Sequence, residues 1–481
     1  MLKVLFVASE AVPFAKTGGL ADVAGSLPKA LRAQGIDVRV VLPKYGAVPE
    51  KYQENMRFLF ETTVDVSWRR QYCGVLETEQ DGVPVYFIDN EYYFKRDGFY
   101  GYEDDAERFA FFSRAVLDML PEIGFEPDVI HCNDWHTGLV GVFLKLFYQD
   151  DARYAKIKNV FTIHNLKYQG VFSKQIVPDV LGLEWKYFNN GDLEFFDAVN
   201  YMKGGIVYAD VVTTVSRTYA KEVQYPYFGE KLDALLRSRA DMLHGILNGI
   251  DYDEYNPKTD AHIFARYDAE QPLGKVENKV ELQKQLGLPV RRDVPLLAIV
   301  SRLVAAKGID LISHIIDELL TDEDVQLVVL GTGDRHYEDL FKSLAWRYPT
   351  KVSANILFHN ELAHRIYAAS DLFLMPSQYE PCGIGQLIAL RYGSIPVVRE
   401  TGGLKDTIEP YNKYARTGNG FTFANYNAHE LLFAIKRALG LYSDTSQWDS
   451  LVKNAMTSDY SWRHSAELYK ALYAGLCGME G

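Results

Sequence analysis

The sequence has little cysteine, no long apolar run and no excess of positive charge. Its 481 residues include four cysteines that lie far apart and form no C-x-x-C pair, namely Cys73, Cys132, Cys382 and Cys477. This spacing argues against a zinc site and against a disulfide scaffold, and it favours a reducing, cytoplasmic location. No apolar run approaches the ~20 residues that a helix needs to span a bilayer, so no membrane partner is expected.

The charge balance disfavours another class of partner. The formal net charge of −13 opposes a polyphosphate backbone, so no nucleic-acid partner is expected, although a local basic pocket could hold one diphosphate. No G-x-G-x-x-G follows the first apolar run, which weighs against a dinucleotide dehydrogenase. That run, within residues 1–10, lacks a small-residue cleavage site and is interpreted as a buried strand rather than a signal peptide.

The apolar runs that are present are short, and they alternate with helical patterns. With 48% hydrophobic and 24% charged residues, the chain has the composition of a globular protein with two large domains. Continuous apolar runs fit parallel strands covered on both faces, and helical segments between them complete an α/β, doubly wound sheet. In the first half, strands are predicted at residues 4–8, 38–42, 83–88, 129–131, 160–163 and 211–215, and helices at 20–34 and 106–120.

A polar stretch at 251–275 separates this half from a second α/β unit. Strands of the second unit are predicted at residues 296–300, 326–330, 356–358, 372–375, 395–398 and 421–423. The expected domains are 1–245, 246–460 and a final helical segment, 461–481, that returns to the first domain. Because α/β sheets bind ligands at the carboxyl ends of their strands, two such sheets facing across a deep cleft would share one site.

A loop with a cation and two glycines follows the first predicted strand. Lys16 precedes Gly18 and Gly19, whose lack of a side chain lets the backbone approach a ligand closely. The ammonium group and the N-terminus of the following helix would both attract an anion. An ordinary turn before a helix is the alternative interpretation.

Two further cations follow the first strand of the second unit. Arg302 and Lys307 place a guanidinium and an ammonium group at a strand end, where the pair can clamp a diphosphate. A solvated pair at the start of a helix is the alternative. Lys16 would add a third cation from the other domain, and stabilising a leaving phosphate requires such charge.

Other strand-end loops of the second unit carry a carboxylate or glycines. Glu380 lies near a predicted helix start, where its carboxylate could accept sugar hydroxyls or could merely compensate the helix dipole. Thr-Gly-Gly at 401–403 offers backbone N–H groups to an anion. The G-x-G at 331–333 is a weaker signal, since this pattern marks many turns.

Strand ends in the first half carry histidines. His131 and His136 flank Asp134, and His164 ends the next strand. A strand-end histidine is more often a structural group than a catalyst. Three histidines also suggest a metal, but no acidic or cysteine ligand completes a usual spacing, so no metal is predicted.

The motifs form a recognisable series when they are taken together in chain order. They are Lys-Thr-Gly-Gly-Leu-Ala-Asp-Val at 16–23, Asn-Asp-Trp-His at 133–136, His-Asn at 164–165, Ser-Arg-Leu with Lys-Gly at 301–308, Glu-Pro-Cys-Gly at 380–383 and Thr-Gly-Gly-Leu at 401–404. This series resembles the bacterial and plant glycogen (starch) synthases over essentially the whole chain. The resemblance implies a GT-B architecture of two Rossmann-like domains, a nucleotide-sugar donor held mainly by the C-terminal domain, retention of configuration, and no metal or other cofactor.

The resemblance also implies roles for individual residues. Lys16, Arg302 and Lys307 would bind the diphosphate, Glu380 would position the transferred glucose, and Asp134 and His164 would lie near the anomeric centre and acceptor. The implied donor contacts are Gly18, Gly19, Asn248, Gly331, Gly333, Cys382, Gly383, Thr401, Gly402 and Gly403, and the implied acceptor or sugar contacts are Tyr93, Trp135 and Asn165. Of these, Tyr93 is the looser match. The implied reaction moves glucose from ADP-glucose, or less readily UDP-glucose, to the non-reducing end of an α-1,4-glucan such as glycogen.

Several alternatives stay open at this stage. Another retaining GT-B transferase of the sucrose or trehalose type, or a catalytically silent glucan-binding protein, would share much of the pattern. Retention could proceed by same-face attack, or through a covalent bond to Asp134 or Glu380. The sequence leaves open the donor base, allosteric control, the primer and whether the chain forms a homo-oligomer.

Overall fold

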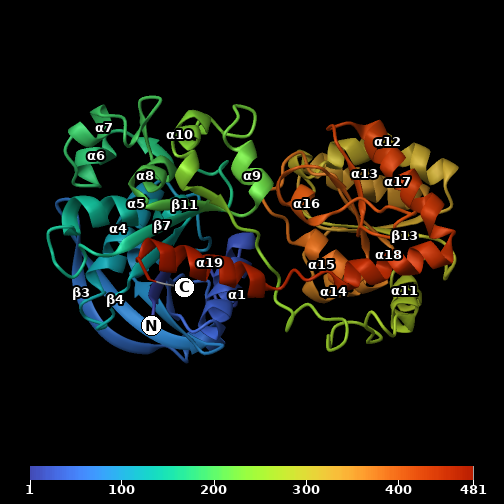
Figure 1. The fold of residues 1–481 in the computed structure, drawn as a ribbon, viewed down its shortest axis with the longest axis horizontal. Helices are drawn as coiled ribbons and strands as arrows, with labels where there is room; N and C mark the ends of the chain where they lie inside the picture. Colours follow the sequence, from blue (N-terminus) through green and yellow to red (C-terminus); the bar gives the residue numbers. More distant parts are fainter. Residues whose placement is uncertain (480–481) are drawn as a thin grey trace. The chain divides into compact units, whose positions relative to one another are not determined.

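The structure, a computed structural model, describes residues 1–479, so the last two positions of the predicted segment 461–481 lie outside the described residues. The chain divides into two compact units (Figure 1). The first unit holds Met1–Gly249 together with the C-terminal segment that begins at Trp462, and the second unit holds Ile250–Ser461. The chain therefore changes units after 249 and after 461, where the sequence led us to expect 245 and 460.

The first unit is built on a nine-stranded sheet with the order β12-β11-β7-β6-β1-β2-β5-β4-β3. The strands are β1 (Lys3–Val7), β2 (Asp37–Pro43), β3 (Arg57–Val66), β4 (Arg69–Gln80), β5 (Val83–Asp89), β6 (Val129–Asn133), β7 (Lys158–Ile163), β11 (Val211–Thr214) and β12 (Leu243–Gly245). The six strands predicted for this half are confirmed, each within two residues at either end.

One part of this sheet corrects the expectation of purely parallel strands. The hairpin β3–β4 pairs antiparallel, and β4 also pairs antiparallel with β5. Most residues of this hairpin are polar or partly exposed, and its apolar stretches, 58–60 and 73–76, are short and flanked by polar residues. A search for buried parallel strands therefore passes over it.

Helices cover the sheet of the first unit. The longer ones are α1 (Gly19–Ala33), α4 (Asp105–Asp118), α8 (Tyr201–Tyr208) and α19 (Trp462–Leu476). Shorter ones are α2 (Glu50–Gln53), α3 (Glu91–Phe94), α5 (Gly138–Phe143), α6 (Ile176–Asp179), α7 (Lys186–Asn189), α9 (Arg217–Glu222) and α10 (Asp233–Ser238). A small sheet holds β8 (Val171–Ser173), β9 (Glu194–Phe195) and β10 (Ala198–Asn200). The final helix, α19, belongs to the first unit, where it contacts α1.

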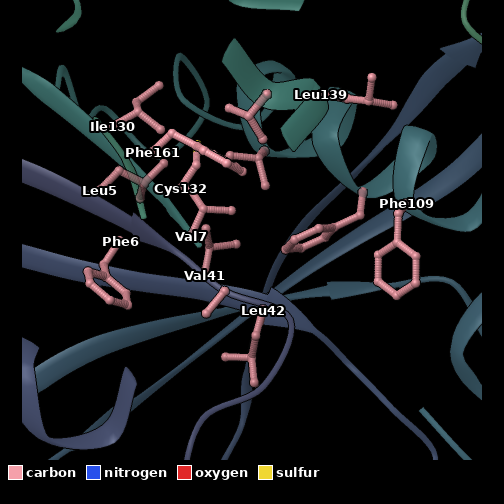
Figure 2. Packing of buried hydrophobic residues seen from close by; sticks show 14 of the residues in the cluster. Leu5, Phe6, Val7, Val41, Leu42, Phe109, Ile130, Cys132, Leu139 and Phe161 are labelled. Carbon is pink, nitrogen blue, oxygen red and sulfur yellow. The ribbon is translucent and has the colours of Figure 1, made fainter. Parts of the chain in front are cut away.

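The core of the first unit gathers on the central strands. Figure 2 shows Leu5, Phe6 and Val7 of β1 among side chains of the neighbouring strands and helices. All three are fully buried, as are Phe109 of α4 and Leu139 of α5. The continuous apolar run of β1 is thus explained by burial on both faces of the sheet. This rigid centre fixes the positions at which β1, β6 and β7 end.

The second unit is built on a six-stranded, fully parallel sheet with the order β15-β14-β13-β16-β17-β18. The strands are β13 (Leu296–Val300), β14 (Gln326–Leu330), β15 (Val352–Asn355), β16 (Leu372–Met375), β17 (Ile395–Arg399) and β18 (Phe421–Phe423). The helices are α11 (Leu273–Gln285), α12 (Ile309–Asp322), α13 (Arg335–Arg347), α14 (Asn360–Ala369), α15 (Gly385–Arg391), α16 (Gly402–Thr407), α17 (Ala428–Tyr442) and α18 (Thr445–Thr457).

One strand of this unit was placed wrongly from sequence. The run 356–358 was expected to be a strand, but β15 precedes it. Leu357 and Phe358 are 40% and 85% exposed, so this apolar run belongs to the loop at the carboxyl end of β15. Apolarity alone does not separate a buried strand from an exposed apolar loop.

The stretch from 251 to 272 has no regular helix or strand, in line with its polar sequence. It is tied to the second unit by Asp260, whose Oδ2 accepts hydrogen bonds from His364 Nδ1 at 2.7 Å and from the Tyr392 hydroxyl at 2.5 Å. Ile250 donates its N–H to the Tyr460 carbonyl at 2.9 Å, so the two chain crossings are joined by a backbone hydrogen bond. Among the described residues, no helix combines the length and the apolarity needed to cross a membrane.

Candidate active site

Three neighbouring parallel strands of the first unit end side by side. Val7 of β1 pairs with Cys132 of β6, and Asn133 of β6 pairs with Thr162 of β7. The polar residues that follow these strands therefore meet at one edge of the sheet. We call this the first strand-end edge, formed by Glu10, Lys16, Asn133, Asp134 and His164.

The loop after β1 is organised by a buried carboxylate. Glu10 is 4% exposed and accepts hydrogen bonds from the backbone N–H and the hydroxyl of Thr17. Lys16 is paired with Asp22 of α1, with Nζ and Oδ1 2.6 Å apart. Burial raises the pKa of both Glu10 and Asp22. An anion approaching Lys16 would have to compete with the Asp22 carboxylate.

Asp134 holds the backbone of the next strand end. Its φ of 57° is in the left-handed region, which is uncommon for a residue with a side chain. Its Oδ1 accepts hydrogen bonds from the backbone N–H groups of His164 at 2.8 Å and Asn165 at 3.4 Å. Burial raises the pKa of Asp134 to about 7. The carboxyl group thus joins the ends of β6 and β7.

The three histidines have different surroundings. His131 is fully buried, with Nδ1 2.6 Å from the Tyr473 hydroxyl of α19 and Nε2 2.5 Å from Thr162 Oγ1. Burial lowers its pKa to about 3, as it does for His164. The ring of His136 stacks on Trp135 with centroids 3.9 Å apart. His131 and His136 are therefore packed inside the unit, and His164 remains at the edge, 9% exposed.

The histidines do not assemble a metal centre. Within residues 1–479, no three His, Cys, Asp or Glu side chains gather in a way that could hold a metal ion. Metal independence itself remains a prediction.

Two predicted sugar contacts are aromatic residues that also pack within the unit, and their contact with a sugar stays a prediction. Tyr93 is fully buried, and its hydroxyl donates to Glu107 Oε1 at 2.5 Å. Trp135 is 8% exposed and covers Gly170, where an added Cβ would lie 2.3 Å from the indole ring. Both aromatic rings serve the core here, which the chain pattern could not distinguish from a sugar platform.

The other two predicted contacts of this unit are polar. Asn165 accepts a hydrogen bond from the backbone N–H of Lys167 at 3.1 Å, which is a local turn. Asn248 is 5% exposed, and its Oδ1 finds no hydrogen-bond partner in the described part of the chain. Burying an acceptor without a hydrogen-bond partner costs free energy. The Oδ1 of Asn248 is therefore better suited to accept a hydrogen bond from a ligand than to serve a purely structural role.

The second unit has a comparable edge at the carboxyl ends of β13, β14, β16 and β17. Arg302 follows β13 and is exposed. Within residues 1–479, no hydrogen bond or ion pair holds its guanidinium group. Lys307 Nζ lies 2.5 Å from Glu380 Oε2, which also accepts from the Ser377 hydroxyl at 3.1 Å. We call this the second strand-end edge, formed by Arg302, Lys307, Ser377 and Glu380.

Glycines make the loops of the second edge compact. Gly402 begins α16 with a φ of 43°, and an added Cβ would lie 2.0 Å from the Glu380 carbonyl oxygen. At Gly331, after β14, an added Cβ would lie 1.8 Å from the Ser301 carbonyl oxygen. The loops therefore pack backbone against backbone around Glu380. The remaining predicted donor contacts follow the same strands, namely Gly333, Cys382, Gly383, Thr401 and Gly403, and Cys382 and Thr401 are buried.

Sequence reasoning missed three candidates at these edges. Glu10 and Asn133 were not singled out, because a polar residue after a strand is common and its partners are distant in sequence. Phe358 was assigned to a strand, whereas its exposed ring follows β15 at the second edge, where it could stack on a flat base. An exposed aromatic after a strand is the signal that could have found it.

Comparison with known proteins agrees with this architecture. Residues 3–238 match the family model described as the starch synthase catalytic domain, and residues 282–455 match glycosyl transferases group 1. A glycogen synthase from Desulforamulus reducens is 57% identical over 475 residues, which cover 99% of each chain. The chain belongs to the glycogen and starch synthase family. A glycogen synthase from Clostridium beijerinckii is also 57% identical, over 480 residues and the full length of both chains.

Solved structures show the same fold. The catalytic domain of starch synthase IV from Arabidopsis thaliana, bound to ADP and acarbose, superposes with a TM-score of 0.92 at 37% identity and 99% coverage of both chains. Sucrose-phosphate synthase from Thermosynechococcus elongatus has a TM-score of 0.62 at 18% identity, covering 99% of this chain and 100% of that one, and so shares the fold alone. The predicted GT-B fold, the predicted family and the assignment as a nucleotide-sugar glycosyltransferase are confirmed.

Proposed function

We propose that this synthase transfers glucose from ADP-glucose to the non-reducing end of an α-1,4-glucan such as glycogen, with release of ADP and retention of configuration. The observation that carries the donor is the Arabidopsis starch synthase domain, which was solved with ADP bound. ADP is what ADP-glucose leaves behind after transfer. A cytoplasmic setting, predicted from the cysteine pattern, fits this proposal.

The second edge suits the leaving diphosphate. Charge develops on the phosphate oxygens as the bond to glucose breaks, and preorganised cations lower the energy of that state. The guanidinium fork of Arg302 is exposed and can donate two hydrogen bonds to the oxygens of a phosphate. Lys307 can turn from Glu380 toward a phosphate, which would leave the Glu380 carboxylate to accept glucose hydroxyls. Lys16 would be a third cation, once it leaves Asp22.

Retention is best served by same-face attack. A covalent route would need a free carboxylate nucleophile, but Asp134 Oδ1 accepts two backbone N–H groups and Glu380 is bound by Lys307 and Ser377. In the favoured route, the acceptor hydroxyl attacks the anomeric carbon as the bond to the diphosphate breaks. A donor phosphate oxygen takes the proton of the incoming hydroxyl, so ADP leaves protonated and no group of the protein changes charge.

An elongation assay tests the donor and the product. Glycogen is incubated with labelled ADP-glucose or UDP-glucose, and incorporation is measured. We expect ADP-glucose to be used with a higher kcat/KM, and NMR of the product to show new α-1,4 links. Preference for UDP-glucose would overturn the donor, and β-linked product would overturn retention.

The same assay in excess chelator tests the cofactor proposal. Because side-chain cations are proposed to stabilise the leaving group, elongation should continue in EDTA at an unchanged rate. Loss of activity in EDTA that magnesium restores would show that a divalent ion is needed.

A further inference from the structure

The amide of Asn133 has a defined orientation. This residue is fully buried at the end of β6, and its Nδ2 donates to the Val7 carbonyl at 2.9 Å and to the His131 carbonyl at 3.3 Å. Rotating the amide by half a turn would place Oδ1 against two carbonyl oxygens, which repel it. Oδ1 must therefore point the other way, and there it lies 2.9 Å from Nε2 of His164.

The orientation of Asn133 determines where His164 carries its proton. An amide oxygen only accepts hydrogen bonds, so Nε2 of His164 must be the donor. Burial lowers the pKa of His164 to about 3, so the ring is neutral and carries a single ring N–H. Nδ1 then has a lone pair and no hydrogen. Within residues 1–479 no hydrogen bond reaches Nδ1, while the residue keeps 9% of its surface exposed.

The neighbouring histidines lack this arrangement. Both ring nitrogens of His131 are engaged, one by Tyr473 and the other by Thr162. The ring of His136 lies against Trp135 inside the core. The backbone of His164 is also fixed, because its N–H is held by Asp134. Among the strand-end histidines of the described chain, His164 has one nitrogen held and the other unoccupied.

We propose that Asn133 is a positioning residue that holds His164 in the Nε2–H tautomer, so that Nδ1 accepts a hydrogen bond from a substrate hydroxyl. The identity of that substrate as a sugar rests on the proposed function, whereas the tautomer does not. An acceptor nitrogen selects for donors. A hydroxyl is favoured at this position, and a carboxylate or carbonyl oxygen at the same place is opposed by lone-pair repulsion.

The tautomer can be measured directly on the full-length protein. Histidine is labelled with ¹⁵N, and the two ring nitrogens of His164 are identified as the pair of signals that disappears in His164→Gln. We expect a protonated Nε2 and an unprotonated Nδ1 that do not titrate between about pH 6 and pH 8. A proton on Nδ1, or a titrating imidazolium in this range, would overturn the proposal whether or not the enzyme is active.

Two substitutions at Asn133 separate positioning from mere packing. Asn133→Ala removes the acceptor, so both tautomers become accessible and kcat/KM should fall roughly 10–100-fold at every pH, as when an orienting partner of a histidine is lost. Asn133→Asp keeps the oxygen that accepts from Nε2–H, but its second oxygen faces the Val7 and His131 carbonyls, which repel a carboxylate and accept from a protonated carboxyl group. Activity should therefore be retained at pH values where this buried carboxyl group is protonated. The kcat/KM should fall as the pH rises through the pKa of that group, whereas Asn133→Ala should be low at every pH.

The titratable groups that interact with His164 are His131, whose pKa the His164 ring helps to lower, and Asp134, which accepts from the backbone N–H of His164; both are unchanged in these variants. A purely structural role of Asn133 would lower both variants alike at every pH, which would contradict the proposal. Asn159→Ala is the matched control. Asn159 is 1% exposed near the start of β7, and its side-chain atoms have no partner among the described residues. The variant Asn159→Ala should leave the ¹⁵N signals of the His164 ring unchanged.

The outcomes distinguish this inference from the proposed function. If the wild-type protein fails to elongate a glucan but shows a protonated Nε2, the substrate proposal fails and the positioning role stands. If it elongates glucan and shows a protonated Nδ1, the positioning role fails and the function stands. Thermal melting of each variant shows whether it still folds. If a variant does not fold, the ¹⁵N spectrum of the wild-type protein alone tests the tautomer of His164.

Discussion

The two strand-end edges follow the same topological rule but hold charge in opposite ways. In the first unit, burial raises the pKa of the two carboxyl groups of the edge, Glu10 and Asp134, while its one cation, Lys16, is paired with Asp22 of α1. In the second unit the edge presents an exposed guanidinium group at Arg302 and an ammonium group at Lys307, within loops shaped by glycine. Similar sheets thus support different electrostatic environments.

The comparison indicates a division of labour. The carboxyl group of Asp134, whose pKa burial raises to about 7, and the neutral imidazole of His164 can exchange hydrogen bonds while carrying little charge, which suits sugar hydroxyls. Exposed or lightly paired cations suit a diphosphate, whose charge increases during the reaction. We therefore expect the charged part of the donor to depend most on Arg302 and Lys307 of the second edge.

The largest effect is expected from removing a cation of the second edge. Arg302→Ala and Lys307→Ala should each lower kcat/KM by roughly 10²–10³, the scale of losing one preorganised group that stabilises developing charge. Folding should be nearly unchanged. Arg335→Ala is a matched control, since the Arg335 side chain is 94% exposed on α13. If Arg302→Ala and Lys307→Ala both keep near-native turnover and an unchanged melting temperature, other residues bind the diphosphate.

Glycine substitutions compare how tightly the loops of the two edges are packed. In Gly402→Ala the added Cβ would meet the Glu380 carbonyl at 2.0 Å, so the free energy of unfolding should fall by about 1–3 kcal/mol and activity should fall with it. At Gly18 nothing lies within 4 Å of an added Cβ, so Gly18→Ala should change stability by less than about 0.5 kcal/mol. Denaturant unfolding of both variants measures the difference. Equal losses would mean that the two loops are packed alike.

The acidity of the first edge predicts a pH dependence of stability. With a pKa of about 7, Asp134 stays protonated in the folded protein at pH values where the unfolded carboxyl has already ionised. The folded state then binds more protons, so this group makes stability fall as pH rises from about 4 to 7. Relative to Asp134→Asn, wild type should lose roughly 1 kcal/mol per pH unit between about pH 5 and pH 7. Parallel stability curves of the two proteins would contradict the buried, protonated state.

The smallest effect is expected from the exposed pair of the first edge. The side chains of Lys16 and Asp22 are 43% and 25% exposed, so Lys16→Ala should cost less than about 1 kcal/mol of stability. Activity should nevertheless fall, because Lys16 is proposed to contact the donor. Thermal melting and donor kinetics on the same preparation check both statements. A large stability loss with unchanged kinetics would make Lys16 a structural residue.

The chain pattern predicted most of the framework and several site residues. Strands β13, β14 and β16 lie where continuous apolar runs placed them, because full burial demands such runs. The hairpin β3–β4 was missed because its apolar stretches are short and flanked by polar residues, and Phe358 was misplaced because an exposed loop can also be apolar. Tyr93 matched a sugar contact by position, yet the fold encloses it beside Glu107.

Sequence by itself determined the α/β class, the two-unit order, the family and which polar residues follow each strand, since burial and turns impose local patterns. Only the tertiary structure decided which of those residues face one another and in what state. Asn133 acquires its orientation from Val7, 126 positions away, and the raised pKa of Asp134 comes from burial under the surrounding chain. Hydrogen-bond partners and desolvation arise from segments that only folding brings together, so no local pattern records them.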